Sequence, residues 1–231
     1  MNIIITGASS GIGKELVKRY KNQGHNVFEI SRRSEKYSCD VSDFDKLRAI
    51  IKEIVFNNEI DMVIANAGIS YPHSKEFMEF NDFKHTIDVN FISVHALLEN
   101  IVPQMKQNKK GKIVIISSLA GFVASPTSLA YSSSKRALNS YAEALRNQLA
   151  PFNIKVINIQ PGFIKTEMTD KNKFKMPFLM SLEEGVDEIE KAIAKNKKEY
   201  AFPFIFATAV KFLSMLPVSI RDFILQKWAK N

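Results

Sequence analysis

Apolar runs of strand length alternate with helix-length segments, and this alternation restricts the possible folds more than any other feature of the chain. Strands are expected at 3–6, 27–31, 61–65, 112–117 and 154–160, and helices at about 12–23, 42–55, 81–106 and 128–149. Parallel strands need crossover helices, which cover both faces of the sheet. The sequence therefore predicts an α/β fold: a Rossmann-type doubly wound parallel sheet with helices on both faces.

Two local patterns support the proposed helices. The first helix is stopped by Gly24, a residue that adopts the left-handed conformation after a helix. The second begins near Ser42-Asp43-Phe44-Asp45, where an acid follows the expected cap, and its apolar residues share one face. The link from the second strand to Cys39-Asp40 is too short for the helix expected there.

Ligands bind at the carboxyl ends of the strands in such sheets, so the strand ends are the first places to look for a site. The first strand leads directly into a helix through Thr6-Gly7-Ala8-Ser9-Ser10-Gly11-Ile12-Gly13. Glycines permit a tight turn and close approach to a pyrophosphate, and the helix N-terminus offers free N–H groups. The spacing is G-x-x-x-G-x-G rather than G-x-G-x-x-G. Its position after the first strand predicts a dinucleotide site.

Tyr131 and Lys135 lie four residues apart in an expected helix, where side chains at this spacing are neighbours. An adjacent ammonium favours the phenolate and so suits acid–base chemistry. With six tyrosines and many lysines such a pair also arises by chance, and Tyr71 and Lys75 form a second pair, interrupted by Pro72. Ser118 ends a strand, where a serine more often satisfies the local backbone.

Taken together, these pieces resemble the short-chain dehydrogenase/reductase family over roughly residues 2–166. Besides the glycine-rich turn, the matching segments occur in the family's order: Asp40-Val41, Asn66-Ala67-Gly68, Asn90, Ser118, Tyr131-Ser132-Ser133-Ser134-Lys135 and Pro161-Gly162. The resemblance implies hydride transfer between a nicotinamide cofactor and a carbonyl or alcohol. The non-catalytic alternative is a sensor or scaffold that binds NADP(H) without turnover.

The resemblance also implies residue roles. Tyr131 would exchange the substrate proton, Ser118 would bind the substrate oxygen, Lys135 would hold the ribose and lower the tyrosine pKa, and Asn90 would support a water-linked proton relay. Asp40 and Val41 would meet the adenine, Asn66-Ala67-Gly68 would line the adenosine side, and Pro161 with Gly162 would approach the carboxamide. The predicted cofactor site comprises Gly7, Ser9, Ser10, Gly11, Ile12, Gly13, Arg32, Arg33, Asp40, Val41, Asn66, Ala67, Gly68, Tyr131, Lys135, Pro161, Gly162, Ile164 and Thr166.

A preference for NADP(H) over NAD(H) is expected from the end of the second strand. NAD-binding sites usually place an acid there, which binds the ribose hydroxyls. In this chain Ser31 stands at that place, and Arg32 follows as a fixed positive charge able to bind a 2′-phosphate. The alternative is that Arg32 and Arg33 are merely solvated.

Two segments leave alternatives open. Residues 167–180 mix Lys171, Lys173 and Lys175 with apolar side chains, which fits either a mobile basic loop or an apolar cover over the substrate. Residues 204–231 are expected to form a C-terminal apolar helical hairpin on a catalytic domain of residues 1–203, with Pro217 between the helices and Ser219 as a cap. This hairpin could pack on the protein's own body, on a partner subunit, or on lipid, with Lys211, Lys227 and Lys230 toward headgroups.

Charge and composition narrow the function classes further. The net charge is +8, but the lysines are scattered, which favours a solvated surface over nucleic-acid binding. The histidines and the single cysteine, Cys39, lack ligand spacing, so no metal site is expected. A strand directly after Met1 leaves no room for a leader, so a cytoplasmic protein is expected, with peripheral membrane contact through the hairpin as an addition. The family resemblance implies a homo-oligomer, a dimer or tetramer.

Overall fold

A seven-stranded parallel sheet organises the computed structural model, which describes residues 1–71, 77–172 and 174–228. The strand order is β3-β2-β1-β4-β5-β6-β7, and all pairs are parallel. The strands are β1 (Asn2–Thr6), β2 (Asn26–Ser31), β3 (Tyr37–Ser38), β4 (Met62–Ala65), β5 (Gly111–Ile116), β6 (Ile154–Pro161) and β7 (Glu199–Phe202). The order reverses at β1, between β2 and β4, and this switch point is where such sheets bind ligands.

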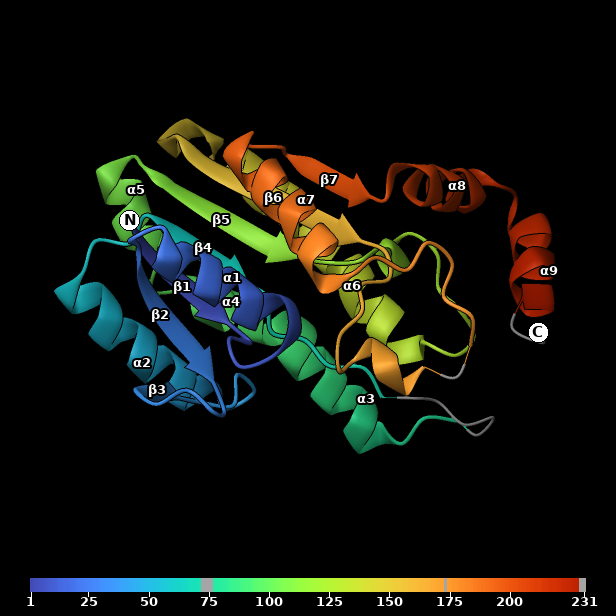
Figure 1. Cartoon of the computed structure of the whole chain (residues 1–231), viewed down its shortest axis with the longest axis horizontal. Coiled ribbons are helices and arrows are strands. Elements are labelled where there is room, and N and C mark those ends of the chain that lie inside the picture. Colours follow the sequence, from blue (N-terminus) through green and yellow to red (C-terminus); the bar gives the residue numbers. More distant parts are fainter. Residues whose placement is uncertain (72–76, 173, 229–231) are drawn as a thin grey trace.

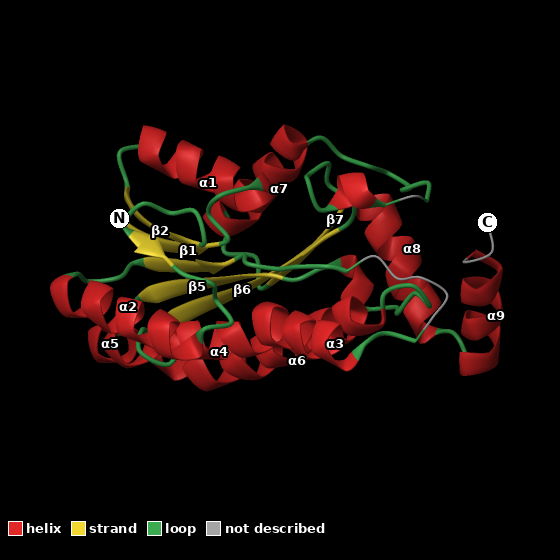
Figure 2. Cartoon of the chain, turned by 90° about the horizontal axis from the view of Figure 1, so that it is seen from below, coloured by secondary structure: helices red, strands yellow, loops and turns green. Residues whose placement is uncertain are grey.

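Helices cover both faces of this sheet, as Figure 2 shows edge-on. One layer holds α1 (Gly11–Asn22) and α7 (Leu182–Ala194). The other holds α2 (Phe44–Asn57), α3 (Phe80–Ile87), α4 (Ser93–Leu98), α5 (Val102–Asn108) and α6 (Leu129–Leu149). The predicted doubly wound fold is confirmed.

Successive side chains of a strand point to opposite faces, so the two layers have separate cores. In β1, Ile3 and Ile5 belong to the core under α1 and α7, whereas Ile4 belongs to the core under α2, α4 and α6. All three are fully buried. Burial on both faces explains why the strands read as continuous apolar runs rather than alternating ones.

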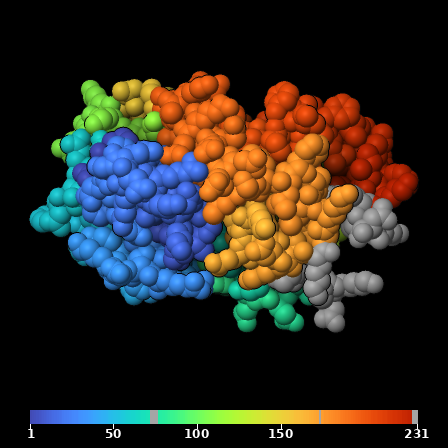
Figure 3. Space-filling model, in the orientation of Figure 1, coloured from blue at the N-terminus to red at the C-terminus, as the bar shows by residue number. Residues whose placement is uncertain are grey.

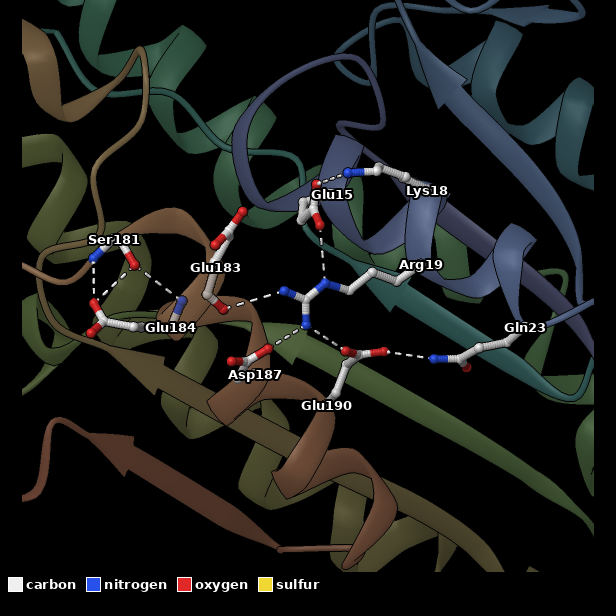
Figure 4. Close-up of polar contacts among 9 residues, drawn as sticks. All are labelled: Glu15, Lys18, Arg19, Gln23, Ser181, Glu183, Glu184, Asp187 and Glu190. Atoms are coloured by element: carbon white, nitrogen blue, oxygen red, sulfur yellow. Dashed lines mark hydrogen bonds and ion pairs between the residues drawn. The ribbon is translucent and has the colours of Figure 1, made fainter.

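An ion-pair network ties α1 to α7 across the first layer (Figure 4). The Arg19 guanidinium lies 2.8 Å from Glu190 Oε2 and 3.0 Å from Glu15 Oε1, and it also pairs with Asp187. Ser181 and Glu184 form a capping box that fixes the start of α7. These contacts hold α7, which precedes the last strand, against the helix that follows the glycine-rich turn.

The structure differs locally from the sequence-based expectations. The helix expected at 81–106 is divided into α3, a π-helical turn (Asp88–Ile92), α4 and α5. The cap of α2 is Asp43, whose carboxylate accepts from the Lys46 N–H at 3.1 Å, and Ser42 instead binds Asp40. The short strand β3 occupies the link that was too short for a helix.

The C-terminal segment forms two helices, α8 (Phe204–Met215) and α9 (Val218–Trp228). α9 begins one residue before the predicted cap Ser219, with the Pro217 carbonyl accepting from the Arg221 N–H at 3.0 Å. In Figure 1, α8 continues outward from β7 and α9 runs across its line, so the two helices meet at an open bend. No helix among the described residues is long and apolar enough to cross a membrane.

Candidate active site

The glycine-rich turn has a geometry that only glycine permits. Gly7 and Gly11 have φ values of +67° and +49°, in the left-handed region. A Cβ on Gly13 would lie 2.2 Å from the Gly7 carbonyl oxygen. The helix that follows has no side-chain cap at Ser10 and no acid in its first turn. Its N–H groups therefore remain available for an anion, and the turn fits a pyrophosphate.

The end of β4 is attached to the same turn through side chains. The Thr6 hydroxyl accepts from the N–H groups of Asn66 and Ala67, both at 3.1 Å, and the Asn66 amide donates to the Thr6 carbonyl at 3.0 Å. A Cβ on Gly68 would lie 3.7 Å from Lys135 Nζ. The predicted adenosine-side segment thus runs from the glycine-rich turn to the predicted catalytic lysine.

At the end of β2, Arg32 extends into solvent with a side chain 72% exposed, its nearest guanidinium nitrogen 3.9 Å from an Asp40 carboxylate oxygen. Burial raises the pKa of Asp40, but hydrogen bonds from Ser42 and the Arg32 charge outweigh it and lower the pKa overall. Ser31 is buried and hydrogen-bonded to Ser34 at 2.7 Å. Arg33 is exposed and Val41 is buried beside Asp40. No carboxylate occupies the Ser31 position.

Lys135 is 3% exposed and donates from Nζ to the Ile116 carbonyl at 2.9 Å. Its Nζ lies 5.6 Å from the centre of the Tyr131 ring, as expected for neighbours on one helix face. Burial disfavours the ammonium and lowers the pKa of Lys135 to about 8. Among the described residues the ammonium has no second acceptor, which leaves donors for a ribose.

The Ser118 hydroxyl lies near enough to Tyr131 to act on its phenol. Burial raises the pKa of Tyr131, and the Ser118 hydroxyl only partly opposes this effect. The sequence led us to expect a lowered pKa for Tyr131, but burial is the larger effect. A raised pKa keeps the phenol protonated at neutral pH, the form that can donate a proton.

Asn90 sits in the π-helical turn with no exposed surface. Its side-chain oxygen accepts from the Ile69 N–H at 2.7 Å, and its amide donates to the Ile69 carbonyl and to the Ser134 hydroxyl, both at 3.0 Å. Asn90 therefore joins the segment after β4 to the turn of α6 that carries Lys135. Its part in a proton relay stays a prediction.

The segment after β6 closes the other side of the site. The Ser118 hydroxyl lies 3.5 Å from the Pro161 carbonyl, its acceptor. Ile164 is buried and pairs with Met180 in an isolated bridge. A Cβ on Gly11 would lie 3.2 Å from a Thr166 methyl group. The predicted carboxamide-side residues therefore reach from Ser118 back to the glycine-rich turn.

The sequence-based prediction missed a buried polar network beneath Lys135. The Asn139 side-chain oxygen accepts from Ser117 Oγ at 2.8 Å, from the Asn158 amide at 3.0 Å and from the Gln160 amide at 3.3 Å. The Ser117 hydroxyl also lies 3.2 Å from the Lys135 carbonyl. The network clamps α6 to the ends of β5 and β6. Its signal was two polar residues, spaced two apart, in an otherwise apolar strand.

Most predicted site residues thus meet along one edge of the sheet, the carboxyl ends of β1, β4, β5 and β6. The competing pair of Tyr71 and Lys75 cannot be compared in the same way, because Lys75 lies outside the described residues, as do Lys173 and Lys230. These four strand ends, the uncapped helix α1 and the buried Lys135 together fit a dinucleotide.

Known proteins were compared with the chain. A family model described as short chain dehydrogenase matches residues 1–176. An uncharacterized oxidoreductase of Myxococcus xanthus (strain DK1622) is 32% identical over 240 residues, covering 95% of this chain and 94% of the relative. A 3-ketodihydrosphingosine reductase of Bacteroides thetaiotaomicron is 35% identical over 176 residues, covering 73% of this chain and 65% of the relative.

Solved structures share the fold. A short chain dehydrogenase from Burkholderia cenocepacia J2315 in complex with NADP superposes with a TM-score of 0.83 at 23% identity, covering 98% of this chain and 96% of that one. At this identity the likeness concerns the arrangement of the chain, which agrees with the sheet order and helix layers described above.

Proposed function

The chain belongs to the short-chain dehydrogenase family of oxidoreductases, and from this premise we propose that it transfers a hydride between NADP(H) and the carbonyl or alcohol group of a small molecule. The observation that carries the proposal is the buried Lys135 ammonium 5.6 Å from the centre of the Tyr131 ring, with the Ser118 hydroxyl near the tyrosine at the end of β5. This set lies at the strand ends where a nicotinamide would reach from the glycine-rich turn.

The residues divide the chemistry between binding and proton transfer. When bound, the reduced cofactor supplies a hydride to the carbonyl carbon. Ser118 and Tyr131 hydrogen-bond the carbonyl oxygen, on which negative charge develops, and Tyr131 gives up its proton to that oxygen. Lys135 holds the ribose with its free donors, and Asn90 keeps the turn of α6 in place.

A preference for NADP(H) follows from the end of β2. Arg32 is exposed and has no firm partner, since the Asp40 oxygen stands 3.9 Å away. It is free to turn toward a 2′-phosphate, and Ser31 brings no negative charge that would repel one.

We also propose how the protein assembles and where it is located. A groove between α4, α5 and α6 is lined by His95, Leu98, Glu99, Val102, Pro103, Lys106, Tyr141, Ala144, Leu145 and Gln148. We assign this groove to a homo-oligomer contact, in a cytoplasmic protein. Exposed apolar residues of α8 and α9, with Lys211 and Lys227 nearby, support peripheral contact with an anionic membrane.

A screen of NADPH oxidation over carbonyl compounds of graded size tests the function, with Tyr131→Phe as the decisive variant. The substitution removes the transferable proton and keeps the ring, so kcat should fall at least a hundredfold while NADPH binding is retained. Tyr37→Phe, in β3 at the opposite edge of the sheet from β6 and β7, is the matched control and should keep its activity. Near-normal turnover by Tyr131→Phe would contradict the assignment.

A further inference from the structure

α8 begins directly beside the predicted catalytic groups. The Gly162 N–H donates to the Phe202 carbonyl at 2.7 Å, and a Cβ on Gly162 would lie 3.1 Å from the Phe206 ring. Pro161, the residue before this glycine, lies at the Ser118 hydroxyl. The first turn of α8 therefore packs against the backbone that leads away from Ser118.

Four phenylalanine rings extend from this contact, and we call them the aromatic wall: Phe163, Phe174, Phe178 and Phe206. Phe206 stacks with Phe163 at 5.9 Å between ring centres and with Phe178 at 5.7 Å, and Phe174 meets the edge of Phe163 at 5.8 Å. The rings come from three stretches of chain, yet form one surface. Phe174 and Phe178 are about half exposed, at 45% and 53%.

The loop that carries two of these rings contains half-buried methionines among exposed charged and aromatic side chains. Backbone hydrogen bonds between Met180 and both Phe163 and Lys165 close its base. The charged residues of the loop are exposed, namely Lys165, Glu167, Asp170, Lys171 and Lys175. The half-buried side chains include Met168, Met176 and Met180. Methionine adapts its shape to flexible apolar partners, so the inner side of this loop suits a hydrocarbon.

The apolar surface continues past the wall along the C-terminal helices. The exposed large apolar residues there are Phe204, Ile205, Phe212, Met215, Val218, Ile220, Phe223 and Ile224. Figure 3 shows the loop and these helices at one end of the molecule. Exposed apolar patches of this extent usually mark a binding surface. Its inner part begins at Phe206, which lies against Gly162, next to the Pro161 carbonyl that Ser118 contacts, so the substrate is the molecule best placed to cover that part.

We propose that the substrate is a long-chain carbonyl compound, whose carbonyl oxygen meets Ser118 and Tyr131 and whose hydrocarbon chain lies on the aromatic wall. This inference rests on the proposed reductase function. Each methylene transferred from water to an apolar surface should raise kcat/KM about twofold to fourfold, until the chain passes the end of the wall.

The test is a series of linear methyl ketones, from 2-butanone to 2-undecanone, assayed with NADPH below their solubility limits. Wild type should show kcat/KM rising with each methylene and then levelling off. Phe178→Asn should reduce the ratio of long-chain to short-chain activity about tenfold or more. Asparagine tolerates the left-handed backbone of this position, where φ is +54°, so the variant is expected to fold. Phe56→Asn, at an 89% exposed phenylalanine on α2, is the matched control and should keep the wild-type slope.

A second measurement does not depend on turnover. Linear 1-alkanols from butanol to undecanol are added to the enzyme with saturating NADP⁺, and Tm is recorded. Tm should rise with chain length in wild type, and rise less in Phe178→Asn. A flat response in both series overturns the substrate class.

The outcomes separate this inference from the proposed function. Equal activity on short and long ketones would remove the long-chain assignment and leave the reductase standing. If no ketone is reduced although the alkanols still stabilise the protein by chain length, the reductase function fails and the apolar site stands. Phe178→Asn could instead change the sedimenting mass and leave the dependence of kcat/KM on ketone chain length unchanged. The aromatic wall would then belong to an interface between two copies, and the inference would be wrong.

Discussion

The site contains a buried ammonium group, and burying this charge opposes folding. Lys135 is 3% exposed, and its ammonium has one acceptor, the Ile116 carbonyl. Burial lowers its pKa from the ordinary 10.5 to about 8. The folded protein thus keeps a charge at neutral pH that its surroundings disfavour, as binding sites often do at the expense of stability.

The sign of this effect gives a stability prediction. Between pH 8 and 10.5 the unfolded chain holds the Lys135 proton and the folded protein has released it, so stability rises with pH across this window. Lys135→Met lacks the titration. The unfolding free energy of wild type relative to this variant should therefore increase by about 3 kcal/mol from pH 7 to pH 10.5. Urea unfolding at the two pH values measures it, and a difference independent of pH would disprove the lowered pKa.

Cofactor choice is also decided at the scale of one residue. Arg32→Ala should weaken NADP(H) binding about tenfold or more, since a charge-assisted contact with the 2′-phosphate is lost, and should leave NAD(H) binding nearly unchanged. The ratio of kcat/KM for the two cofactors in both proteins measures this. Arg33→Ala, also exposed and one residue further along, is the natural comparison. An unchanged ratio in Arg32→Ala would show that another group selects the cofactor.

At the scale of elements, the Asn139 network holds α6 against β5 and β6. One carbonyl oxygen accepts from three side chains, while the side-chain oxygens of Asn158 and Gln160 have no partner among the described residues. The members of the network therefore contribute differently to stability. Asn139 provides a hydrogen-bond acceptor to several side chains, whereas Gln160 buries a side-chain oxygen that has no partner among the described residues. Burying unpaired polar atoms costs stability, so the two residues should respond to mutation in opposite ways.

Asn139→Leu should lower the unfolding free energy by about 2–4 kcal/mol, because it leaves the buried amides of Asn158 and Gln160 without an acceptor. Gln160→Met keeps the volume and removes the unpaired oxygen, so stability should be unchanged or slightly higher. As a positioning residue, Asn139 should also affect kcat more than KM, because Ser117 connects it to Ser118 and Lys135. Denaturant unfolding and steady-state kinetics decide this. Equal destabilisation by both variants would contradict these different contributions.

Elements differ in how far the sequence predicts them. The strands and long helices follow from local periodicity, and their ends fell within a few residues, as at Gly24 and Leu149. The division of the helix expected at 81–106 could not be predicted from local periodicity, because it depends on hydrogen bonds from Asn90 to Ile69 and Ser134, which are remote in sequence. The position of α8 could not be predicted either. Its contact with Gly162 arises because β7, which precedes α8, pairs with β6, which precedes Gly162. The pieces of the site were readable as motifs, but their distances were not.

At the scale of the molecule, the layer that contains α4, α5 and α6 carries the groove proposed as the contact between two copies of the chain. The groove between α4, α5 and α6 holds the exposed Ala144 beside Leu98, Val102 and Leu145. If two copies meet there, a long charged side chain at this position would be buried against its own symmetry mate.

Ala144→Arg should therefore shift the protein toward a smaller sedimenting species, without changing the fold. Ala49→Arg, at an exposed alanine on α2, is the control and should sediment as wild type does. Analytical ultracentrifugation over a range of concentrations makes the measurement. An unaltered mass for Ala144→Arg would place the oligomer contact elsewhere.

The strand order has a consequence for how the chain is made. β1 leaves the ribosome first, yet it belongs in the middle of the sheet, between β2 and a strand that comes only at Met62–Ala65. Every neighbour in a parallel sheet arrives after a crossover, so one edge of β1 stays open while α2 is synthesised. β6 and β7 then extend the sheet from the opposite side. The nascent chain therefore carries the apolar strand β1 without one of its two neighbours until Met62–Ala65 has been made, so fast synthesis of this stretch or chaperone binding to β1 would limit aggregation.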